Sequence, residues 1–88
     1  MDRIAVIQDR HPSLSDNQCR SLLLAPYLSG QDDELCDKHF SEHMDHAAVS
    51  ISHFDGDDIK SILERFPDYG AAPIKCDCCD ELIQPELD

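Results

Sequence analysis

The clearest hydrophobic pattern in the chain lies in residues 58–66. Its apolar positions follow the i, i+3, i+4, i+7 spacing of one helix face: Ile59, Ile62, Leu63 and Phe66. The preceding residues 55–57 (Asp-Gly-Asp) supply a turn and a capping side chain, and Pro67 stops a helix because it lacks a backbone N–H. The pattern therefore predicts a short amphipathic helix here.

A second helix is predicted for residues 32–48, with Asp32 or Asp33 at its N-terminus. At 100° per residue one stripe collects Cys36, Phe40, His43, Ala47 and Ile51, with Leu35, His39 and His46 on one flank and Met44 on the other. The opposite face is polar: Asp37, Lys38, Ser41, Glu42 and Asp45. We therefore expect a cysteine and two or three histidines on the buried side or its edge.

A third helix is predicted for residues 15–24. Ser15 and Gln18 have the spacing of a capping box, and Pro26 disfavours helical geometry at the residue before it. Two short apolar segments leave alternatives open. Residues 4–7 fit an edge strand or an ordered N-terminal arm, and the alternating residues 49–54 fit a short strand or an extended connection.

The chain has 88 residues, of which 41% are hydrophobic and 30% charged, as in globular domains. The length favours one small domain over residues 1–84, with residues 85–88 as a frayed tail. No apolar run is long enough to cross a membrane, and the first ten residues lack the apolar core of a secretion signal. The expected location is therefore the cytoplasm.

The net charge is −12, from 19 acidic and 7 basic side chains. Residues 31–88 carry 16 of the acids and four of the bases, so the excess lies entirely in this part. Nucleic-acid binding is disfavoured, because affinity for a duplex comes from cations that displace counterions. Such a surface favours a protein partner with a basic face, although acidity also serves solubility alone.

The chain has five cysteines, an odd number that argues against a disulfide framework in a chain without a secretion signal. Cys76 and Cys79 form a Cys-x2-Cys pair, the spacing with which a tight turn directs two thiolates at one zinc ion. The pair His39 and His43, or Cys36 with His39, can complete a tetrahedral site from residues 32–48.

Other interpretations of these residues remain open. Cys78 can replace either thiolate, Cys36 and His43 can be ordinary core residues, and His39 can be a surface residue. Because an 88-residue domain has a thin core, structural zinc can add on the order of 10 kcal/mol to its folding. We therefore predict a mostly α protein: a compact bundle of about three short helices with a C-terminal zinc knuckle, with or without a short N-terminal strand.

Residues 57–83 combine an amphipathic helix, a Tyr69-Gly70 pair and the late Cys76-x2-Cys79. In this respect the chain resembles small zinc-binding accessory proteins from the early regions of lambdoid phages. The resemblance covers under a third of the chain. It implies a compact helical fold whose tail is tied down by zinc, with Cys76 and Cys79 as ligands, and an origin in a phage or mobile element.

Three functions are compatible with these features. The favoured one is a non-catalytic acidic interaction protein that binds, and in one version inhibits, a basic protein. Its candidate contact residues are Asp37, Glu42, Asp45, Asp57, Asp58 and Glu64. A DNA-binding regulator would need Arg20, Lys60, Arg65 and Lys75 in one patch. A thiol enzyme is disfavoured because neighbouring carboxylates oppose thiolate formation. A homodimer fits each of the three.

Overall fold

The computed structural model describes residues 2–28, 37–67, 69, 75, 80–83 and 85, and for residues 26–28 and 37–43 it describes the backbone alone. Within these ranges the chain forms four α-helices: α1 (Arg3–Arg10), α2 (Asp16–Leu28), α3 (Asp37–Ser52) and α4 (Gly56–Arg65). The prediction of a mostly helical protein is confirmed. The described part holds one helix more than the three expected, because the N-terminal segment is also helical.

Helix α1 corrects the prediction of a short N-terminal strand. The Asp2 carboxylate caps the helix by accepting a hydrogen bond from the backbone N–H of Ala5, at 3.1 Å. Ile4 and Ile7 are three residues apart and both buried, so one helix face meets the core. A strand would have placed these two side chains on opposite faces, so the cap and the burial together decide for the helix.

The capping box of α2 is confirmed in both directions. Ser15 Oγ accepts from the backbone N–H of Gln18 at 3.2 Å, and the Gln18 side chain accepts from the backbone N–H of Ser15 at 2.9 Å. The predicted end near Leu24 is wrong, since α2 continues through Pro26 to Leu28. Pro26 lies in the last turn of the helix, and because proline has no backbone N–H, one i→i−4 hydrogen bond is missing there.

Helix α3 extends to Ser52, so the strand or extended connection predicted after Ala48 is wrong. Its buried side chains in the described part are Met44, Ala48, Ile51 and Ser52. This stripe is shifted by one residue from the predicted one, since Ala47 is only half-buried and His46 is exposed. Alternation over six residues was misleading because four of them occupy the last turns of a half-buried helix.

Helix α4 is the element that the sequence predicts best. Asp55 caps it by accepting from the backbone N–H of Asp58 at 2.8 Å, and Ile59 is buried. The helix begins two residues earlier than predicted and ends one residue earlier, at Arg65. Phe66 follows as the C-cap, and its carbonyl accepts a hydrogen bond from the Ser21 hydroxyl, which ties the end of α4 to α2.

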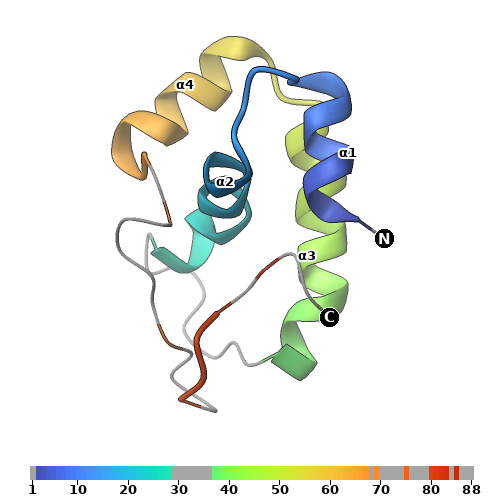
Figure 1. The fold of residues 1–88 in the computed structure, drawn as a ribbon, viewed down its shortest axis with the longest axis vertical. Coiled ribbons are helices and arrows are strands. Elements are labelled where there is room, and N and C mark those ends of the chain that lie inside the picture. The colour runs from blue at the N-terminus through green and yellow to red at the C-terminus, as the bar shows by residue number, and fades with distance from the viewer. Residues whose placement is uncertain are drawn as a thin grey trace.

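The helices pack so that α1 lies alongside α3, while α2 contacts α1, α3 and α4 (Figure 1). The core lies between them and is formed by Ile4, Ile7, Cys19, Leu22, Leu23, Leu24, Met44, Ala48, Ile51, Ile59, Tyr69 and Ile83. Within the described residues, no helix is both long and apolar enough to cross a membrane.

The described C-terminal residues are attached to this core. The Tyr69 hydroxyl donates to the carbonyl of Ile83, whose side chain is buried. Pro85, which the sequence analysis places in the tail, is buried as well, and its carbonyl accepts from Arg3 Nη1 at 2.6 Å. Ordered packing thus reaches at least one residue beyond position 84.

Candidate functional site

None of the side chains predicted to bind zinc is among those that the structure describes. Cys36, Cys76 and Cys79 lie outside the described residues, as does Cys78, the alternative ligand. His39 and His43 belong to α3, where only the backbone is described. Among the side chains that the structure does describe, no group of three potential ligands surrounds a common point. The metal site therefore stays a prediction.

The described neighbours of the cysteine pair are nevertheless informative. Lys75 and Leu82 form an antiparallel β-bridge, which brings the two ends of the intervening six residues to within about 5 Å. Asp80, one residue after Cys79, has a φ of 57°. This left-handed conformation reverses the chain in tight turns, and aspartate tolerates it better than most residues. The residues on either side of the Cys-x2-Cys pair, Lys75 and Leu82, are thus held next to each other.

The described cysteine, Cys19, is fully buried in α2 and joins the core. Burial raises the pKa of its thiol to about 11, and the nearby Asp16 carboxylate adds to that shift, while Arg20 opposes it. The raised pKa keeps this thiol protonated at neutral pH and opposes a nucleophilic role, and no described group of potential metal ligands includes it. Its role is that of a small apolar core residue.

The acidic residues predicted to contact a partner have different environments. Asp57, Asp58 and Glu64 are exposed on α4. Asp45 is 38% exposed and forms an ion pair with Arg3, at 2.8 Å between Oδ1 and Nε. Asp37 and Glu42 lie in the part of α3 without described side chains. Three of the six candidates are therefore placed on an open surface, and a fourth has a partner inside the protein.

Arg3 is a residue that sequence reasoning missed. Its side chain is completely buried and connects α1 to Asp45 of α3 and to the carbonyl of Pro85. Arginine side chains are mostly exposed, so the sequence gives no reason to expect this one to be buried. The one signal is that Arg3 directly precedes the apolar residues that begin at Ile4. Arg3 links three segments that are distant in sequence.

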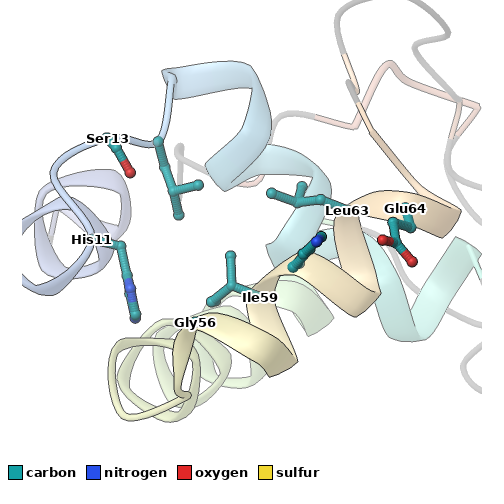
Figure 2. A pocket seen from close by; sticks show the side chains of 8 residues that line it. His11, Ser13, Gly56, Ile59, Leu63 and Glu64 are labelled. Carbon is teal, nitrogen blue, oxygen red and sulfur yellow. The ribbon is translucent and has the colours of Figure 1, made fainter.

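A shallow groove of about 380 Å³ lies between the α1–α2 connection and α4 (Figure 2). Its lining is mainly apolar, with a few polar groups: His11, Ser13, Leu14, Gly56, Ile59, Lys60, Leu63 and Glu64. We call this feature the α4 groove. The sequence pattern of α4 predicted a buried face, and the groove exists because the face is not completely covered.

His11 is one of the residues that line the α4 groove. Its Nε2 is buried and has no hydrogen-bond partner among the residues that the structure describes. The backbone of His11 is held in place, since its N–H donates to Ile7 at 2.9 Å and its carbonyl accepts from Leu14 at 3.1 Å. A buried nitrogen without a partner requires an explanation, because most such groups are satisfied.

An open groove with an apolar floor and few polar groups can recognise a ligand or a side chain of another molecule. Its described residues do not form a nucleophile–base–acid arrangement of the kind that supports covalent catalysis. We compared the chain with family models, with curated proteins and with solved structures, and none of them matches.

Proposed function

We propose that this protein is a non-catalytic, zinc-stabilised acidic interaction protein that binds a protein partner with a basic surface. The observation that carries the proposal is the net charge of −12 on 88 residues. A field of this sign attracts a basic partner, accelerates its association and repels nucleic acid. The resemblance of residues 57–83 to small phage accessory proteins contributes Cys76 and Cys79 as ligands and an origin in a phage or mobile element, and it does not extend to the acidic surface.

The exposed acids of α4 are the described part of this surface. Asp57 and Asp58 stand in its first turn and Glu64 in its last, and all three are exposed. In the described part of the chain nine acidic side chains are exposed, against four basic ones: Arg10, Lys60, Arg65 and Lys75. Arg3 is buried and Arg20 is half-buried. These positions favour a protein partner over DNA.

Zinc is proposed as the element that holds the C-terminal segment together. The ligands would be Cys76 and Cys79 with two of His39, His43 and Cys36. The β-bridge between Lys75 and Leu82 supports this proposal, because it holds together the two ends of the segment that contains the cysteine pair. Four protein ligands leave no open coordination position, so such a zinc ion supplies folding energy and no catalysis.

Native mass spectrometry with and without a chelator tests the metal. We expect one zinc ion per chain, lost with Cys76→Ser or Cys79→Ser and kept with the control Cys19→Ala, because the buried Cys19 is not a ligand. The same spectra report whether the protein is a monomer or a dimer. A zinc-free wild-type protein that unfolds cooperatively at the same temperature with and without chelator would contradict the zinc proposal.

Affinity capture across a range of ionic strength tests the partner. The immobilised protein is expected to retain basic proteins at low salt and to release them as salt screens the charges. The variant Asp57→Lys should retain less, whereas Asp9→Lys on α1, which changes the net charge by the same amount at an exposed position, serves as the control. Retention that does not depend on salt, or retention of duplex DNA, would count against the proposal.

A further inference from the structure

We propose that the α4 groove is the docking site for a basic amphipathic helix of the partner protein. This inference deepens the proposed function and rests on it. The acidic surface favours a basic partner, and the groove indicates where the apolar side chains of that partner bind. In this mode an amphipathic helix lays apolar anchors into a groove and its charges meet the rim.

The floor of the groove is formed by aliphatic side chains. Ile59 and Leu63 are one turn apart on α4 (Figure 2), and Leu14 of the α1–α2 connection lines the same groove. Leu14 and Leu63 are only half-buried, so apolar surface remains for a partner to cover. A row of this kind, with one-turn spacing, matches the i, i+3, i+4 anchors of an antiparallel or parallel helix. The volume of 380 Å³ accommodates anchor side chains and not an entire helix.

Polar groups stand at one end of the groove. His11 and Ser13 both line it from the α1–α2 connection, and Ser13 is exposed (Figure 2). A polar side chain of the docked helix can form a hydrogen bond with the Ser13 hydroxyl, which would set the register of the helix.

The negative charge of α4 favours a basic molecule as the occupant of the groove. Helix α4 and its cap carry four carboxylates, Asp55, Asp57, Asp58 and Glu64, against Lys60 and Arg65. A second copy of this chain would bring another −12 to the same place and is therefore disfavoured. A helix with lysines or arginines beside its apolar face complements both the floor and the rim.

Gly56 provides a means of blocking the groove without disturbing the fold. It lines the groove at the first position of α4, and a Cβ built there meets no atom within 4 Å. A bulky side chain can therefore extend into the groove from this position. Ser61 is exposed on the same helix and does not line the groove, so a tryptophan there is the matched control.

The probe is a synthetic helical peptide of leucine and lysine, with leucines at i, i+3, i+4 and i+7. Binding is followed by fluorescence anisotropy at physiological ionic strength. We expect Gly56→Trp to weaken binding by about tenfold or more, because at least one buried leucine loses its place. Ser61→Trp should bind as the wild type does. Lys60→Glu should strengthen binding several-fold, because it removes the one base that lines the groove.

A peptide of the same composition with scrambled order, and a leucine–glutamate peptide, separate the possible outcomes. Equal binding of the basic peptide to wild type and Gly56→Trp, with unchanged circular dichroism, would overturn the groove and leave the acidic interaction protein standing. Equal binding of the scrambled peptide would also overturn it. No binding of any basic peptide, or preference for the acidic one, would overturn both proposals.

Discussion

The buried side chain of Arg3 leads to the sharpest prediction about stability. Asp45→Ala removes the carboxylate that accepts from Nε at 2.8 Å and so takes one ion-pair partner from a completely buried guanidinium. Breaking a fully buried pair costs about 3–5 kcal/mol, and losing an exposed pair costs about 0–1 kcal/mol. Because Asp45 is 38% exposed, water can replace part of the interaction. We therefore expect a loss of about 2 kcal/mol.

A loss of this size lowers Tm by about 8–16 °C in a domain of this length. The free energy of unfolding is measured by urea denaturation, followed by far-UV circular dichroism. Asp45→Asn keeps an oxygen acceptor and should lose only about 1 kcal/mol. The effects of Arg3→Met and Asp45→Ala should be less than additive by about 1–2 kcal/mol, since each removes the same pair.

The ion pair would be refuted as a stabilising contact if Asp45→Ala stayed within about 0.5 kcal/mol of the wild type. Additivity of the two substitutions within the same margin would refute it too. The hydrogen bond from Arg3 to the carbonyl of Pro85 gives a separate check. Arg3→Met should increase hydrogen exchange in the C-terminal segment, whereas Asp45→Ala should affect it less.

Three further predictions follow from individual contacts. Because burial raises the pKa of Cys19 from its ordinary value near 9 to about 11, the unfolded chain loses this proton first as pH rises. The contribution of Cys19 to the free energy of unfolding should therefore be fully present below pH 9 and be lost between pH 9 and 11. Denaturation curves of Cys19→Ala should lack this loss. Peptide mapping after alkylation at neutral pH should find Cys19 unmodified. Tyr69→Phe deletes the donor to the buried carbonyl of Ile83 and should cost about 1–2 kcal/mol in urea denaturation, so an unchanged midpoint would show that this hydrogen bond does not hold the segment. Asp55→Ala removes the α4 cap and should cost about 1 kcal/mol, while Asp55→Asn should cost less, and equal losses for both would contradict the capping geometry.

Some parts of the candidate sites could be predicted from the sequence and others could not. The acids of α4 could be placed on an exposed surface from the sequence, because they alternate with Ile59, Ile62 and Leu63 at helical spacing. The burial of Arg3 and its pairing with Asp45 could not, since the two are 42 positions apart. The α4 groove could not be predicted either, because it requires the α1–α2 connection to face α4.

The sequence by itself determined the local structure wherever side chains act on their own backbone. Ser15 with Gln18 and Asp55 with the first turn of α4 are read directly, because the capping partners lie three residues apart. Tertiary structure decided the rest. Residues 4–7 and 49–52 are helical because burial of Ile4, Ile7 and Ile51 against other helices outweighs weak local preferences. Such burial depends on contacts between distant residues, which a pattern along the chain does not contain.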